Sequence, residues 1–126
     1  MGKYVDGFVL VVPKDKINEY KKMAEEGSRM WMENGALEYM ECMGEDLIPK
    51  EMGGTKPLSF TKIIKAKPND TVWFSFITFS SKTHRDEVNA KVMKLMEKDM
   101  RKDIPIPFDM KHFAFGGFEV IVEGKR

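Results

Sequence analysis

The stretch TVWFSFITF, residues 71–79, decides the fold of this chain. Its β-branched and aromatic residues are typical of a strand, in which successive side chains point to opposite faces of a sheet. One face carries Val72, Phe74, Phe76 and Thr78, and the other carries Trp73, Ser75, Ile77 and Phe79. Because both faces are apolar, we expect both sides of this strand to be shielded from water.

A second strand of the same kind is predicted at Lys3–Val12. It alternates apolar residues on both faces, and Asp6 is the exception. A carboxylate in such a strand needs a hydrogen-bond donor or an open end of the sheet. Arg85, His84 and Lys111 are the candidate donors.

Two helices are predicted, at Lys14–Asn34 and from Lys82 to about Asp99. The first buries a stripe at spacings of three and four, in which Gly27 predicts a close approach of the helix to the sheet. Ser80, Ser81 or Thr83 is expected to cap the second helix. Its buried stripe is His84, Val88, Val92, Leu95 and Met96.

Three further strands complete the predicted sheet: Leu37–Met43, Leu58–Lys65 and about Phe113–Val122. Leu58–Lys65 is expected to form a hairpin with residues 71–79. Ile104–Phe108 reads as an extended crossing stiffened by prolines, and Gly116-Gly117 as a bulge or a point of close approach.

This order of elements predicts a single α+β domain over residues 1–126. Its two strand–helix–strand halves give a ferredoxin-like antiparallel sheet with both helices on one face. The opposite face is then bare and apolar, and such a surface usually marks an interface. We therefore expect a homodimer through the sheet face that the helices do not cover.

Composition excludes several classes of partner. The net charge of +1, with both signs interleaved, gives no basic surface for nucleic acid or for an anionic membrane. No apolar run is long enough to span a bilayer. The single cysteine, Cys42, and a start without a signal sequence predict a cytoplasmic location.

Several motifs resemble one family along almost the whole chain. They are YVDGF at 4–8, GALEY at 35–39 with Glu41-Cys42, HRD at 84–86, VNAKVM at 88–93, FDMK at 108–111 and GGFEV at 116–120. In these blocks the chain is similar to the uncharacterised YbaA-like family (DUF1428). The resemblance implies a dimeric α/β barrel of the ferredoxin-like superfamily. It implies no reaction, cofactor or catalytic residue, because the family has none established.

Three residues are candidates for acid–base chemistry: His84, Asp6 and Glu41. An imidazole on the first turn of a helix feels the positive end of the helix dipole, which favours its neutral, proton-accepting form. The alternative is that His84 caps the helix or binds a strand carbonyl. For Asp6 the alternatives are a structural ion pair and an acid in a pocket.

The same residues with their neighbours predict a ligand site of Asp6, Tyr39, Trp73, His84, Arg85 and Asn89. No spacing of His, Cys or carboxylate residues supports a metal site, and no cofactor is expected. The favoured function is binding of a small, partly apolar metabolite. The alternatives are a cofactor-independent enzyme, isomerase or monooxygenase-like by fold analogy, and a structural or partner-binding protein.

Overall fold

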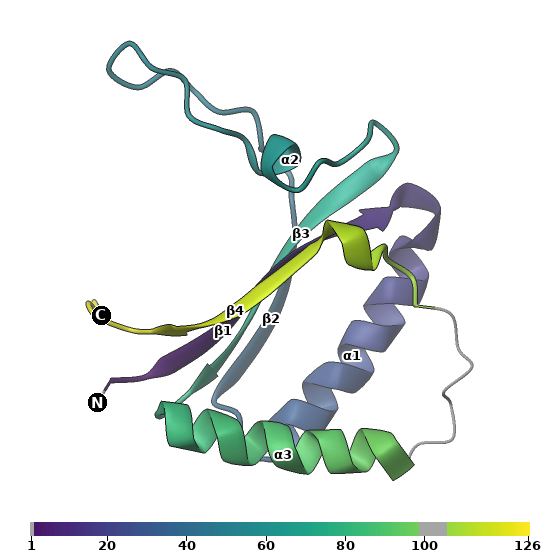
Figure 1. Ribbon diagram of the computed structural model, residues 1–126, viewed down its shortest axis with the longest axis vertical. Coiled ribbons are helices and arrows are strands. Elements are labelled where there is room, and N and C mark those ends of the chain that lie inside the picture. Colours follow the sequence, from purple (N-terminus) through teal and green to yellow (C-terminus); the bar gives the residue numbers. More distant parts are fainter. Residues whose placement is uncertain (1, 99–105) are drawn as a thin grey trace.

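The structure is a computed structural model that describes residues 2–98 and 106–126 (Figure 1). Its elements are β1 (Tyr4–Pro13), η1 (Lys14–Lys16), α1 (Ile17–Glu33), β2 (Glu38–Met43), α2 (Phe60–Ile63), β3 (Asp70–Phe79), α3 (Lys82–Lys98), η2 (Met110–His112) and β4 (Phe113–Glu119). Asp99, the predicted end of the second helix, lies outside the described residues. So do the first two residues of the predicted crossing at Ile104–Phe108.

The four strands form one antiparallel sheet in the order β2-β3-β1-β4. β1 and β3 are the interior strands and pair from Tyr4↔Phe79 to Pro13↔Asp70. This arrangement confirms the predicted α+β, ferredoxin-like fold. It also makes residues 71–79 an interior strand, whose inner face is buried while Phe74 on the other face is 48% exposed in this chain.

The helices α1 and α3 lie against the same face of the sheet, here called the inner face (Figure 1). The rings of Tyr20 and Trp73 meet edge-on at 4.9 Å, and the ring of Phe79 lies 5.9 Å from that of His84. The most deeply buried side chains are Phe79, Leu10, Val12, Val88 and Val92. The buried stripe of α3 is shorter than predicted, because Leu95 and Met96 are 45% and 40% exposed.

The predicted strand at Leu58–Lys65, and with it the hairpin, is wrong. This segment is irregular except for the four-residue helix α2. The hydroxyl of Ser59 accepts the amide of Lys62 and caps that helix. Phe60, Ile63 and Ile64 fit the helical spacing of three and four as well as strand alternation, so their pattern does not distinguish the two.

The same segment covers one end of the opposite face, here called the outer face. Ile64 packs with Val11 and Val72 there, and Leu47 and Ala66 join the cluster. The expectation of a wholly bare face is therefore too simple. Large apolar side chains stay exposed on the remainder of the outer face: Met40 at 45%, Phe74 at 48% and Phe118 at 60%.

Two glycines mark close approaches between elements. A Cβ at Gly27 of α1 would lie 3.0 Å from the hydroxyl of Tyr39 on β2, which confirms that the helix runs close to the sheet. A Cβ at Gly117 of β4 would overlap the phenol of Tyr4 on β1. The β1–β4 pairing runs without interruption through Asp6↔Gly117 and Gly7↔Gly116, so this glycine pair is a close approach and not a bulge.

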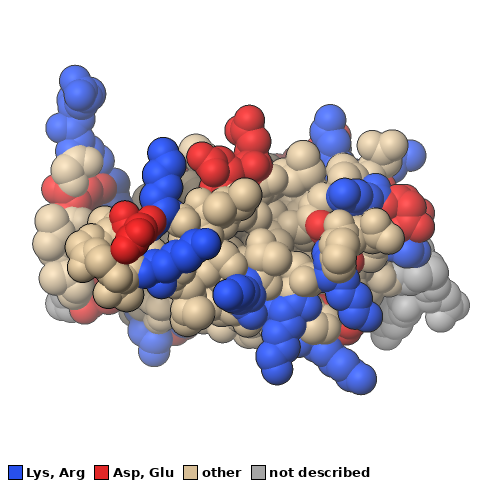
Figure 2. All heavy atoms as spheres, turned by 90° about the horizontal axis from the view of Figure 1, so that it is seen from above, with Lys and Arg blue, Asp and Glu red and all other residues tan. Residues whose placement is uncertain are grey.

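Charged residues of both signs are interspersed on the face drawn in Figure 2, with uncharged residues between them. Within the described ranges, no helix has the length and apolar character needed to cross a membrane.

Replacing Phe79 with alanine should lower the free energy of unfolding by about 3–5 kcal/mol, because its fully buried ring would leave a cavity. The matched control is Phe115→Ala on β4, whose side chain is 70% exposed and should cost less than about 1 kcal/mol. Urea denaturation at one protein concentration measures both. Equal losses for the two variants would contradict this account of the core.

Candidate functional site

A pocket of about 330 Å³ lies between the inner face of the sheet and the two long helices. Most of its wall is apolar, and every strand contributes to it. The described lining is Phe8, Leu10, Tyr20, Met23, Ala24, Gly27, Trp31, Tyr39, Met40, Glu41, Ser75, Phe76, Ile77, Met96, Phe108 and Phe113. Glu41 is the charged residue of this lining, so the chemistry of the pocket centres on it.

Three hydroxyl groups from three elements donate hydrogen bonds to the Glu41 carboxylate. Tyr20 of α1 donates to Oε1 at 2.7 Å, and Tyr39 of β2 donates to Oε2 at 2.8 Å. Ser75 of β3, which stands directly opposite Glu41 in the β2–β3 pairing, also donates to Oε1. This cluster, here called the Glu41 cluster, joins α1 to the sheet through one carboxylate.

The two phenols of the cluster are held in their protonated form. Burial raises the pKa of Tyr20, and the negative charge of Glu41 and the hydrogen bond to it raise that pKa further. The pKa of Tyr39 is raised by the same causes in the same order. Both phenols therefore remain hydrogen-bond donors at neutral pH, and Glu41 is their acceptor.

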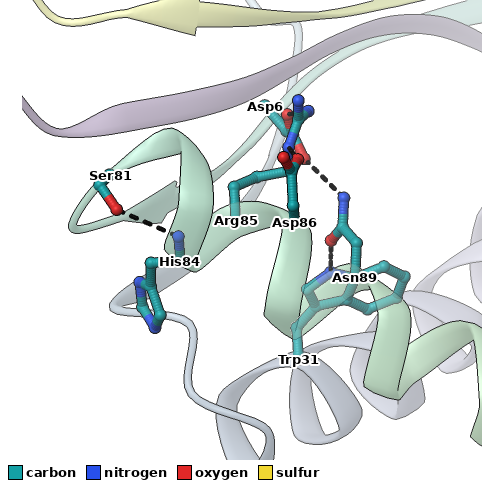
Figure 3. A network of polar contacts seen from close by, with 7 residues as sticks. All are labelled: Asp6, Trp31, Ser81, His84, Arg85, Asp86 and Asn89. Atoms are coloured by element: carbon teal, nitrogen blue, oxygen red, sulfur yellow. Dashed lines mark hydrogen bonds and ion pairs between the residues drawn. The ribbon is translucent and has the colours of Figure 1, made fainter.

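Asp6 belongs to a second polar group beside the pocket (Figure 3). It is 5% exposed, and its Oδ1 lies 2.6 Å from Nη1 of Arg85. Its Oδ2 accepts from Nδ2 of Asn89 at 3.3 Å, and Oδ1 of Asn89 accepts from Nε1 of Trp31 at 3.0 Å. The network connects β1, α3 and α1, and Trp31 is the member that also lines the pocket.

Arg85 has three side-chain partners: Asp6, Asp86 and the ring of Tyr4. Its guanidinium carbon lies 4.7 Å from the centroid of the Tyr4 ring, within cation–π range, and its Nε donates to Asp86 at 2.8 Å. Burial disfavours the charged form, but the hydrogen bond to Asp86 and the charge of Asp6 outweigh it and raise the pKa of Arg85. Among the donors considered for Asp6, Arg85 is therefore the one that the structure provides, in a compensated ion pair.

His84 takes part in capping α3. Its Nδ1 accepts the amide of Ser80 at 3.0 Å, and its own amide donates to the hydroxyl of Ser81 at 3.0 Å. Accepting at Nδ1 places the ring proton on Nε2, which is a neutral tautomer. In Figure 3 the ring points away from Asp6. Within the described residues, His84 makes no hydrogen bond to a carboxylate.

The candidate residues thus fall into separate groups. Tyr39 and Glu41 lie together in the pocket. Asp6, Arg85 and Asn89 form the network beside it, and His84 stands apart at the start of α3. Trp73 packs with Tyr20 in the core and donates from Nε1 to the hydroxyl of Thr71 at 2.9 Å.

Two members of the Glu41 cluster were not predicted as site residues. In the sequence, Tyr20 lies on the apolar stripe of the predicted helix Lys14–Asn34 and Ser75 on a strand face, and neither position by itself indicates a site. The available signal was that Ser75 is polar within an otherwise apolar face, as Glu41 is within its own. Their pairing follows only once β2 is known to lie beside β3.

Metal-ligating residues are dispersed in the described part of the chain, where no group of three His, Cys, Asp or Glu could hold an ion. Cys42 is an exposed thiol on β2, and Nδ1 of His112 lies 2.7 Å from the carbonyl oxygen of Ile64.

Replacing Arg85 with methionine should lower the free energy of unfolding by about 3 kcal/mol, because Asp6 would keep a buried charge without its ion-pair partner. Asp86→Asn is the control: it removes the exposed partner of the same arginine and should cost less than about 1 kcal/mol. Adding Asp6→Asn to Arg85→Met should recover most of the loss. Denaturant titration measures the series, and equal costs for Arg85→Met and Asp86→Asn would contradict the network.

The chain matches known proteins over nearly its full length. Residues 3–110 match a family described as "Protein of unknown function (DUF1428)". The chain is 39% identical over 122 residues to the uncharacterized protein YbaA of Escherichia coli strain K12, covering 96% of this chain and 98% of that protein. The YbaA proteins of Escherichia coli O157:H7 and Shigella flexneri match with the same identity and coverage. The chain therefore belongs to the DUF1428 family of proteins of unknown function.

Proposed function

We propose that the protein is a cytoplasmic homodimer that binds a small, partly apolar metabolite in the pocket between helices and sheet. The pocket itself carries this proposal. Its volume of about 330 Å³ falls at the lower end of the range of small-molecule sites, roughly 300–1,000 Å³. Such sites combine apolar walls with a few placed polar groups, and the Glu41 cluster is a group of this kind.

The alternative is a cofactor-independent enzyme in which His84 and either Asp6 or Glu41 act as an acid–base pair. Such a pair needs mutual reach and free hydrogen-bonding positions. Nδ1 of His84 accepts the amide of Ser80, and Asp6 is held in an ion pair with Arg85 and a hydrogen bond from Asn89, with no hydrogen bond between His84 and a carboxylate among the described residues. This geometry favours binding over proton transfer by these residues. The third possibility, a structural or partner-binding protein, would give the pocket no role.

A second copy of the chain is the proposed partner of the outer face. Met40 of β2, Phe74 of β3 and Phe118 of β4 lie exposed on that face. Two such faces related by a two-fold axis present the same apolar patch to each other. The dimeric barrel implied by the family resemblance has the same geometry. The exposed thiol of Cys42 suits the reducing cytoplasm.

Compounds with a phenyl ring on a short chain that ends in an alcohol, amine or carboxylate should include one that raises the melting temperature by several degrees. A ligand at about 100 times its Kd adds about 2.7 kcal/mol to the stability. Met96→Trp places a larger side chain in the pocket lining and should abolish this shift. Met93→Trp, one turn away on α3 and absent from the lining, is the matched control and should respond like the wild type.

Differential scanning fluorimetry of the three proteins decides the matter. If no compound shifts the wild type, or if Met96→Trp responds as the wild type does, the pocket is not the binding site.

Light scattering at micromolar concentration should report about twice the 14.6 kDa chain mass. Phe74→Asp, which adds a charge to the outer face, should yield a folded monomer, because desolvating an unpaired carboxylate opposes association. Met93→Asp on α3, on the other side of the sheet, should remain dimeric. A wild-type particle of 14.6 kDa would overturn the homodimer.

A further inference from the structure

Two carboxylates on the inner face of the sheet, Asp6 and Glu41, differ in how their charge is balanced. Asp6 has the guanidinium of Arg85 at 2.6 Å. Glu41 has three hydroxyl donors, and among the described residues no lysine or arginine forms an ion pair with it. Glu41 is half-buried, and hydroxyl dipoles stabilise its anion without neutralising it. The pocket therefore holds a negative charge that its own described lining leaves without a counter-ion.

The hydrogen bonds also leave a position open on this carboxylate. An ionised carboxylate offers about four acceptor sites, two on each oxygen. Oε1 accepts from both Tyr20 and Ser75, whereas Oε2 accepts from Tyr39 alone. A further donor is therefore best accommodated at Oε2.

The wall around the carboxylate favours the same kind of ligand. Aromatic side chains of α1, β2 and β4 line the pocket, among them Tyr20, Trp31, Tyr39 and Phe113. The faces of such rings carry negative potential and attract organic cations, whose apolar portion gains burial at the same time. An anionic ligand would instead meet like charge from Glu41.

We infer that the ligand is an organic amine, an apolar or aromatic body carrying an ammonium group that pairs with Oε2 of Glu41. This rests on the proposed function, since it names the class of molecule that the pocket binds. The three hydroxyls hold the carboxylate in place, and the ammonium supplies the charge that they lack. The binding step is non-covalent and consumes no other reactant.

The test compares phenylalkyl amines of one to four methylenes with the alcohols and carboxylates of the same length. Isothermal titration calorimetry at fixed salt should show that the best amine binds at least about tenfold more tightly than its alcohol, since a charge-assisted hydrogen bond is roughly twice as strong as a neutral one. The carboxylates should bind more weakly than the alcohols. This ranking is read on the wild-type protein and does not depend on any variant.

Glu41→Gln keeps the side-chain length and an acceptor for the hydroxyls but removes the charge, and it should abolish the preference for amines. Its matched control is Glu38→Gln, on the same strand, where the exposed carboxylate bonds only Thr78 among the described residues. That variant should keep the wild-type ranking. Equal loss of preference in both variants would mean that bulk charge, not Glu41, selects the amine, and would overturn the inference.

The failures of the two proposals can be told apart. If amines, alcohols and carboxylates all bind equally and Met96→Trp abolishes their binding, the pocket binds ligands but the amine inference is wrong. If none of them binds, or if Met96→Trp leaves amine binding unchanged, the proposed function fails and the inference fails with it.

Discussion

The structure depends on the packing of α1 and α3 against the inner face of β1 and β3. The deepest core residues come from this layer, and within the described residues Asp6 and Ser75 are the buried polar ones. An apolar layer of this kind penalises any polar atom that lacks a partner, by about 1–3 kcal/mol. In the described part of the chain no buried side-chain nitrogen or oxygen is left without one. The polar clusters are thus a consequence of the apolar core, because each polar side chain in this layer needs a hydrogen-bond partner within the protein.

Asp6 and Glu41 have different hydrogen-bond partners, and this difference explains why Asp6 is a structural residue and Glu41 a candidate binding residue. Asp6 is neutralised inside the chain by Arg85, and Asn89 and Trp31 extend that bond to α1. This network is complete without an added molecule. Glu41 lies on a pocket wall and is supported only by hydroxyl groups among the described residues. Of the two, it is the one whose charge an external group could complete.

The sequence predicts the fold well where its pattern has only one interpretation. The alternation of β-branched and aromatic residues over 71–79 fits a strand, and in the sheet β3 pairs with β1 on one side and β2 on the other. The prediction of a strand at Leu58–Lys65 is wrong. The apolar spacing of this segment fits a helix equally well, and the packing of Ile64 against Val11 favours the helix. Leu95 and Met96 follow the helical period, yet periodicity cannot tell where the sheet beneath a helix ends.

The site was predictable only in pieces, because its geometry depends on strand register. Tyr39 and Glu41 share a strand face by alternation alone, and Asp6 could be expected to find a donor. The meeting of Glu41 with Ser75 and Tyr20 needs the β2–β3 register and the position of α1, neither of which is encoded locally. For His84 the local sequence predicts two roles. Its place at the start of a helix fits both acid–base chemistry and capping, and only the hydrogen bond from the Ser80 amide to Nδ1 distinguishes them.

The strand β3 ties the two proposals together physically. Its side chains alternate, so Phe74 faces outward, where a second copy would pack, while Ser75 faces inward and bonds Glu41. A contact that holds Phe74 from outside would also restrain the backbone of Ser75, because adjacent residues of a strand share one peptide plane. A one-residue slip of β3 would exchange the two faces and remove the serine from the pocket. Dimer formation would therefore help to hold the Glu41 cluster in place without contributing a side chain to the pocket.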